Sequence, residues 1–298
     1  MKNETVLNHI KNLDNFYYLP NQGNLGDCVI AAATYKLLDD NNFEYKIFEK
    51  NFNKPFSLVY GGGGLWVKNY RNDYQRILDI FKSENLKKCI ILPSSFNDCP
   101  DLLDILDERF VVFAREQKSF EYLKNYGVKS EIYLADDMVI NANIRELQND
   151  VKNKYFVSRN IFENLKIYRK FYLKINKQIK KALKKYDNYR VGYFLRNDVE
   201  KTIENKPYNN FDLSNCKSAD WTNKKLTFAI AKTFVDIINK FDVIVTDRLH
   251  ISICAANLDK KVLLIDNSYG KNSAVYNYSL KNRENVKLVK YEDLEKEI

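Results

Sequence analysis

The residues of this 298-residue chain that are best suited to chemistry stand together in the segment VIVTDRLHISICAA, residues 243–256. An apolar run delivers Asp247, Arg248 and His250 into a predicted turn ahead of a helix rich in small residues. A guanidinium is always charged and binds a phosphate or carboxylate through its fork, and an imidazole gives or takes a proton near neutral pH. We therefore predict an anion site with an acid or base beside it, in which Asp247 either accepts a proton or orients Arg248.

A second candidate is the loop NQGNLGD, residues 21–27, which directly precedes an apolar helix-like run. Asn24, Gly26 and Asp27 are residue types that tolerate a tight or left-handed backbone, and Asp27 is placed to accept amide protons of the helix. A helix N-terminus offers unpaired N–H groups and a positive dipole end, which suit an anionic or polyhydroxylated ligand. The same pattern also fits an ordinary capped helix.

Other candidates end strand-like runs. The glycines of YGGGG, residues 60–64, would let a ligand approach the backbone closely at Gly62 and Gly63, or they would form a turn. Arg115 follows the run FVVFA and Arg196 closely follows VGYF. Ligands of open parallel sheets bind at the carboxyl ends of strands, so these side chains are predicted to contact substrate. No spacing predicts a metal site or a serine or cysteine nucleophile with its partners, and the five scattered cysteines are predicted to be reduced, buried thiols.

The order of the predicted elements gives the fold class. Strand-like and helix-like runs alternate with short connections, which predicts an α/β protein with parallel sheets covered by helices on both faces. The polar segment 141–186 is helix-like and poor in strand signals. We therefore predict an N-terminal α/β domain, residues 1–150, and a second domain, residues 151–298, that begins with a helical connector.

Composition and charge limit the function classes. The net charge of +9 favours phosphate-bearing partners, acidic polymers or an anionic membrane surface. No apolar run is long enough to span a membrane and no signal-peptide pattern is present, which predicts a cytoplasmic protein. The basic stretch at residues 166–186 is predicted to be a solvated helix with one core-facing stripe, and a helix lying against a membrane is the alternative. We expect no nucleic-acid partner, although charge alone does not exclude one, and the oligomeric state is left open.

Several segments together carry a resemblance to a known family. In chain order, GNLGD, YGGGG, FAREQKSFEYLKNYGV, LADDM and TDRLHISICAANLDKKVLLIDNSYGK resemble the polysaccharide pyruvyl transferase family, and the last segment is the most specific. Members usually carry a glycine directly after the histidine, where this chain has Ile251. The resemblance implies a transferase with two Rossmann-like parallel-sheet domains facing a cleft, similar to the GT-B glycosyltransferases.

The resemblance also implies a reaction. Pyruvate would move from phosphoenolpyruvate to two hydroxyls of one sugar in a bacterial surface polysaccharide, an exopolysaccharide or capsule, or in its precursor, forming a cyclic ketal and releasing phosphate without a further cofactor or a metal. By similarity, Arg248 and His250 lie in the phosphoenolpyruvate site, Arg196 offers a second cationic contact, and the loop around Asn24 and Asp27 faces the saccharide acceptor.

These residues can support that chemistry. Two arginines hold the carboxylate and phosphate of phosphoenolpyruvate, and His250 is the candidate acid that protonates its methylene carbon. Asp27 and Asp247 are both candidates to accept a hydroxyl proton.

Three alternatives stay open at this point. One is a GT-B-type glycosyltransferase that uses a nucleotide-sugar donor in the same kind of cleft. Another is an inactive scaffold of a polysaccharide assembly complex, for which Ile251 is the only support. The third concerns the acceptor: it is free, nucleotide-linked or lipid-linked, and a lipid-linked acceptor would bring the protein to the inner face of the membrane as a peripheral protein.

Overall fold

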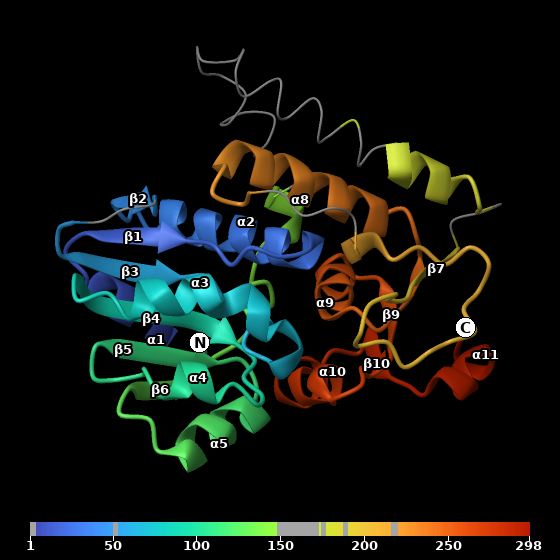
Figure 1. The fold of residues 1–298 in the computed structure, drawn as a ribbon. Helices are drawn as coiled ribbons and strands as arrows, with labels where there is room; N and C mark the ends of the chain where they lie inside the picture. The colour runs from blue at the N-terminus through green and yellow to red at the C-terminus, as the bar shows by residue number, and fades with distance from the viewer. Residues whose placement is uncertain (1–3, 50–52, 148–172, 174–176, 187–189, 216–219) are drawn as a thin grey trace, which may run out of the picture. The chain divides into compact units, whose positions relative to one another are not determined.

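The N-terminal half of the chain forms a parallel sheet of six strands in the order β2-β1-β3-β4-β5-β6 (Figure 1). The computed structural model describes residues 4–49, 53–147, 173, 177–186, 190–215 and 220–298. Parallel neighbours require crossover connections, and helices supply them, as predicted. The strands are β1 Phe16–Leu19, β2 Tyr45–Ile47, β3 Phe56–Tyr60, β4 Leu86–Ser94, β5 Phe110–Ala114 and β6 Glu131–Leu134, and the helices are α1 Glu4–Lys11, α2 Leu25–Asp40, α3 Arg71–Phe81, α4 Pro100–Leu103 and α5 Gln117–Tyr126.

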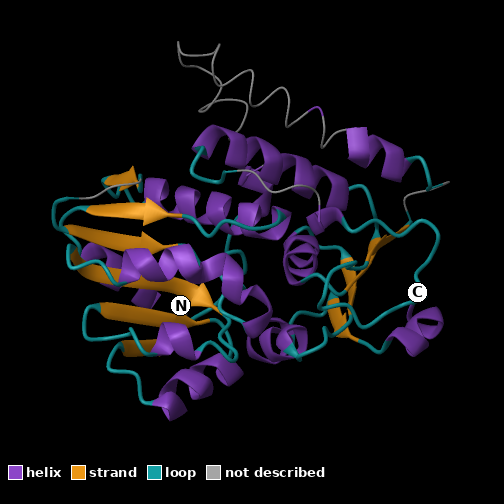
Figure 2. Ribbon diagram, viewed as in Figure 1, coloured by secondary structure: helices purple, strands orange, loops and turns teal. Residues whose placement is uncertain are grey.

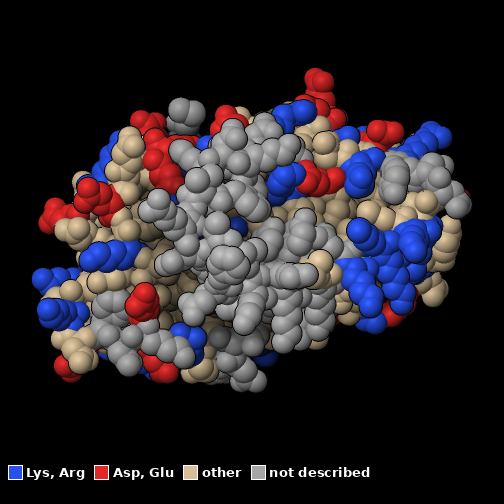
Figure 3. Space-filling view, turned by 90° about the horizontal axis from the view of Figure 1, so that it is seen from above, with Lys and Arg blue, Asp and Glu red and all other residues tan. Residues whose placement is uncertain are grey.

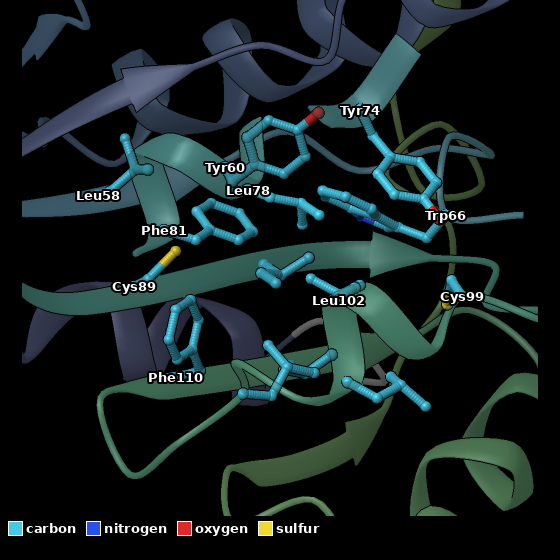
Figure 4. Close-up of a cluster of buried hydrophobic side chains, with 14 of the residues drawn as sticks. Leu58, Tyr60, Trp66, Tyr74, Leu78, Phe81, Cys89, Cys99, Leu102 and Phe110 are labelled. Atoms are coloured by element: carbon cyan, nitrogen blue, oxygen red, sulfur yellow. The ribbon is translucent and has the colours of Figure 1, made fainter. Parts of the chain in front are cut away.

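An aromatic core lies on one face of this sheet. The Trp66 ring contacts Tyr60, Tyr74 and Phe81, and Phe81 also contacts Tyr60 and Phe110 (Figure 4). Strand side chains alternate between the two faces, so every second buried residue of these strands lies on the face opposite the aromatic core. Both faces of the sheet are therefore buried, which explains why its strands read as continuous apolar runs.

A second parallel sheet, with the order β10-β9-β8-β7, forms in the C-terminal half (Figure 2). Helix α8 precedes β8, and helix α9 connects β8 to β9. The α/β class with two parallel sheets is thus confirmed, whereas the GT-B-like arrangement stays a prediction. The elements are β7 Val191–Phe194, β8 Val243–Thr246, β9 Lys261–Leu264, β10 Val286–Leu288, α8 Lys224–Ile238, α9 Leu249–Asn257, α10 Lys271–Val275 and α11 Leu294–Glu297.

The chain divides into two units. The first holds residues Met1–Asn21 and Ala33–Asn141, and the second holds Gln22–Ala32 and Ala142–Ile298. The segment Gln22–Ala32, which contains the start of α2, groups with the C-terminal sheet, whereas the sequence-based division at residue 150 assigns it to the first domain. No helix of the described ranges is both long and apolar enough to cross a membrane.

Part of the predicted basic helix can be compared with the structure. Residues 177–183 are helical, and Ile179, Ala182 and Tyr186 are buried. A core-facing apolar stripe is therefore confirmed for residues 177–186, while 166–172 and 174–176 lie outside the described residues. Cys28, Cys89, Cys99 and Cys254 are buried and form no disulfide, as predicted, and Cys216 lies outside the described residues.

Candidate functional site

The carboxyl ends of β7, β8 and β9 bring the predicted C-terminal site together. Phe194 pairs in register with Thr246, and Thr246 with Leu264, so the residues that follow these strands lie side by side. The backbone N–H of Arg196 donates to Asp247 Oδ1 at 2.8 Å. Arg196, Asp247 and Arg248 are thus neighbours, as their positions after the strands predicted.

Arg248 is held by two carboxylates. Its Nε and Nη2 donate to the two oxygens of Asp212 at 2.9 and 2.6 Å, and its Nη1 lies 2.7 Å from Asp198 Oδ2. The bidentate pair fixes the plane of the guanidinium, and only 4% of Arg248 is exposed. Asp212 and Asp198, and not Asp247, therefore orient the Arg248 side chain.

Arg196 is held in the same way. Its Nε donates to Asp198 Oδ1 at 2.8 Å and its Nη1 donates to Glu200 Oε2. Glu200 Oε2 also accepts from Lys271 Nζ at 3.0 Å and from Asn267 Nδ2 at 2.9 Å. Burial disfavours the charged guanidinium, but the Glu200 and Asp198 carboxylates outweigh it and raise the pKa of Arg196.

We call Arg196, Arg248, Lys271, Asp198, Glu200, Asp212 and Asp247 the charge cluster. It contains one more carboxylate than cation, and every guanidinium nitrogen has a carboxylate partner. The two arginines are thus buried and paired with carboxylates, whereas the sequence singled them out only as cationic contacts for the donor. The spacing of RNDVE, residues 196–200, could have suggested Asp198 and Glu200, whereas no local signal points to Asp212.

Asp247 differs from the other carboxylates of the charge cluster. Its Oδ1 accepts from the Arg196 backbone, but its Oδ2 is buried without a hydrogen-bond partner among the described residues. Burial is the largest cause that raises the pKa of Asp247 to about 6, against the lowering effects of Arg196 and Arg248. This carboxyl group can therefore exchange a proton near neutral pH.

The loop before α2 forms a reciprocal cap. Asn24 Oδ1 accepts from the Gly26 N–H at 2.7 Å, and Asp27 Oδ2 accepts from the Asn24 N–H at 3.0 Å. Asn24 is therefore the residue that caps the first turn, while Asp27 binds back to it, as in a capping box. A Cβ on Gly23 would lie 2.1 Å from Asp27 Oδ2, which explains why glycine stands there.

His250 packs against this cap. A Cβ built on Gly26 would lie 2.7 Å from His250 Nδ1 and 3.0 Å from Asn24 Oδ1. The start of α2 and the first turn of α9 therefore touch within the second unit. This contact joins the loop and the histidine that the sequence singled out separately. Ile251, the departure from the family pattern, is fully buried in α9.

Gly62, Gly63 and Arg115 belong to the first unit. A Cβ on Gly62 would lie 2.5 Å from Pro93 O, and the Gly63 N–H donates to the same oxygen at 3.2 Å. These glycines therefore let the end of β3 approach β4. Arg115 is buried and donates to Asp137 Oδ2 and to Ser95 Oγ, both at 2.9 Å.

No predicted site residue lines the cavity of about 660 Å³ found in the first unit. That cavity lies at the amino ends of β3 and β4, where Ser57 and Lys88 contribute to its wall. Within the described part of the chain, no group of three or more His, Cys, Asp or Glu side chains could hold a metal ion.

Comparison with known proteins identifies the family. The family model described as polysaccharide pyruvyl transferase matches residues 24–269. The crystal structure of a functionally uncharacterized protein from Klebsiella pneumoniae subsp. pneumoniae is similar to the chain, with 28% sequence identity, a TM-score of 0.71 and coverage of 96% of both chains. None of the curated proteins compared with the chain matched it. The matched range contains the α2 cap, His250 and every member of the charge cluster except Lys271. The chain belongs to the polysaccharide pyruvyl transferase family and is a transferase.

Proposed function

We propose that this transferase moves pyruvate from phosphoenolpyruvate to two hydroxyls of one sugar in a bacterial surface polysaccharide or its precursor. The products are a cyclic ketal and inorganic phosphate, and no cofactor besides the donor substrate takes part. The observation that carries the proposal is that β8 leads directly into Asp247 and Arg248 of the charge cluster and, two residues further on, into His250 at the start of α9. The family match contains all three residues.

His250 is the proposed acid. It protonates the methylene carbon of phosphoenolpyruvate, which leaves an oxocarbenium-like carbon that the first sugar hydroxyl attacks. Loss of phosphate forms the electrophile again, and the second hydroxyl closes the ring. The two hydroxyl protons balance the proton gained by the methylene carbon and the proton that leaves with phosphate.

Asp247 is the proposed base. Its Oδ2 has no hydrogen-bond partner among the described residues, and burial raises the pKa of Asp247 to about 6. The other candidate, Asp27, has one oxygen bound to the Asn24 N–H. A carboxylate with an unpaired oxygen and a pKa near the working pH is better suited to accept a hydroxyl proton.

The arginines are the proposed donor contacts. A guanidinium carries five N–H groups, and the contacts of Arg248 with Asp212 and Asp198 use one on each of its three nitrogens. The remaining N–H groups of Arg248 and Arg196 bind the carboxylate and phosphate of the donor. The carboxylates around them keep the two guanidinium planes in place before the substrate arrives.

Acceptor-dependent phosphate release tests this function. Purified protein is incubated with phosphoenolpyruvate and a panel of saccharide acceptors, and inorganic phosphate is measured. We expect release only when an acceptor is present, and its loss in His250→Ala. The matched control is His9→Ala, because His9 is the other histidine of the chain and lies in the first unit. Release without an acceptor, or full activity of His250→Ala, would contradict the proposal.

Thermal unfolding separates this reaction from that of a glycosyltransferase. A ligand stabilises only the state that binds it, so phosphoenolpyruvate should raise the melting temperature of the wild type. Stabilisation by nucleotide sugars, with none by phosphoenolpyruvate, would favour the glycosyltransferase.

A further inference from the structure

A group of exposed lysines that are not members of the charge cluster lies on the second unit. Residues 177–183 are helical, and the buried side chains of Ile179, Ala182 and Tyr186 recur at helical spacing. This spacing turns the intervening side chains outward. We call the exposed side chains Lys177, Lys180, Lys181, Lys184 and Lys185 the lysine surface.

The lysine surface carries five positive charges that no carboxylate of the described residues offsets. None of its five ammonium groups lies within ion-pair distance of a carboxylate of the described residues, in contrast to Lys201 and Lys232, which pair with Glu204 and Asp236. Figure 3 shows Lys and Arg side chains gathered at one end of the face that it presents. Unpaired cations on one face attract an anionic partner over about a Debye length.

An exposed aromatic residue adjoins the lysine surface. Lys185 Nζ donates to the backbone oxygen of Tyr208 at 3.4 Å, and 74% of Tyr208 is exposed. A protruding tyrosine beside lysines matches the side chains that proteins place at lipid headgroups, where the ring is amphipathic and the ammonium groups meet phosphates.

We propose that the lysine surface and Tyr208 bind a membrane that carries anionic phospholipids. The buried apolar stripe of residues 179–186 is not available for insertion, so attraction between lysines and headgroup phosphates provides the binding and Tyr208 contacts the interface. A nucleic acid would use the lysines equally well, but a duplex offers no apolar layer to the Tyr208 ring. Such docking would bring the proposed enzyme to a lipid-linked acceptor, and that last step alone rests on the proposed function.

Sedimentation with vesicles tests the proposal on the full chain. Vesicles of phosphatidylcholine alone are compared with vesicles that contain phosphatidylglycerol, at low and high salt. We expect binding to the anionic vesicles only, and release at high salt because the contact is electrostatic. Each lysine near an anionic surface contributes about fivefold, so Lys180→Gln with Lys181→Gln and Lys184→Gln should weaken binding about 100-fold.

A control variant separates this surface from net charge. Lys118→Gln with Lys124→Gln and Lys129→Gln removes the same charge from exposed positions of the first unit and should retain most of the binding. Equal losses in the two triple variants, or no binding to anionic vesicles, would overturn the proposal, as would binding of a short DNA duplex that is stronger than binding to the vesicles. Stabilisation by phosphoenolpyruvate should be unchanged in the lysine variant, so failure of docking and failure of the proposed reaction are distinguishable.

Discussion

Replacement of Gly26 by alanine tests whether the start of α2 positions His250. The new Cβ would lie 2.7 Å from His250 Nδ1, whereas ordinary van der Waals contact begins at 3.4 Å. The imidazole or the helix must therefore retreat by about 0.7 Å, the difference between these distances. Because a misplacement of about 1 Å can reduce catalysis about 100-fold, we expect phosphate release to fall by roughly 10- to 100-fold. Stability should change by less than about 1 kcal/mol, since alanine is the better helix former.

Histidine NMR measures the displacement directly. The chain contains two histidines, so selective labelling yields two sets of imidazole signals. His9, which contacts the rings of Phe113 and Tyr133 in the first unit, is the internal reference. In Gly26→Ala the His250 signals should shift while the His9 signals stay in place.

Two further variants complete this test. Gly23→Ala crowds Asp27 rather than His250, so it should weaken the α2 cap and move the His250 signals less. In the His250→Ala background, Gly26→Ala should cause no further loss of activity, because both changes act through one side chain. Unshifted His250 signals together with normal turnover in Gly26→Ala would refute the idea that α2 positions the imidazole.

Three other predictions concern stability. The pKa of Asp247 is raised to about 6, so the folded state holds a proton that the unfolded chain releases near pH 4. Ionisation therefore costs stability, on the order of 3 kcal/mol, as the pH rises from about 4 through 6. Asp247→Asn should remove this loss, as measured by urea unfolding from pH 4 to 8, and an unchanged pH profile would contradict it. Asp212→Asn leaves the buried Arg248 without one of its charged partners and should lower the free energy of unfolding by about 3–5 kcal/mol. The control Asp259→Asn, in an exposed pair, should lower it by under about 1 kcal/mol. Equal losses of stability in chemical denaturation would count against a buried ion-pair network. Phe81→Ala, in the fully buried aromatic core, should cost about 3–5 kcal/mol in the same assay, and a loss below about 1 kcal/mol would mean that the core closes around the deletion.

Much of the fold and part of the candidate site were predictable from local pattern. The buried run FVVFA becomes β5 and VIVT becomes β8, because strands buried on both faces are apolar at successive positions. Arg196 and Asp247 become neighbours because the carboxyl ends of adjacent parallel strands share one edge. The carboxylate partners of the arginines were not predictable from local pattern. Asp212 binds Arg248 from 36 residues away, and no periodicity of the sequence predicts that pairing.

Short-range apolar pattern and chain connectivity are enough to predict the alternation of strands and helices, the parallel sheets and the residue types at the strand ends. Long-range packing was needed to show which carboxylates neutralise Arg196 and Arg248, and that Gly26 borders His250. It also grouped the start of α2 with the C-terminal sheet. The physical reason is that such contacts join segments distant in the chain. Whether they form depends on packing of the whole unit, and a buried charge finds its partner only once that packing has excluded water.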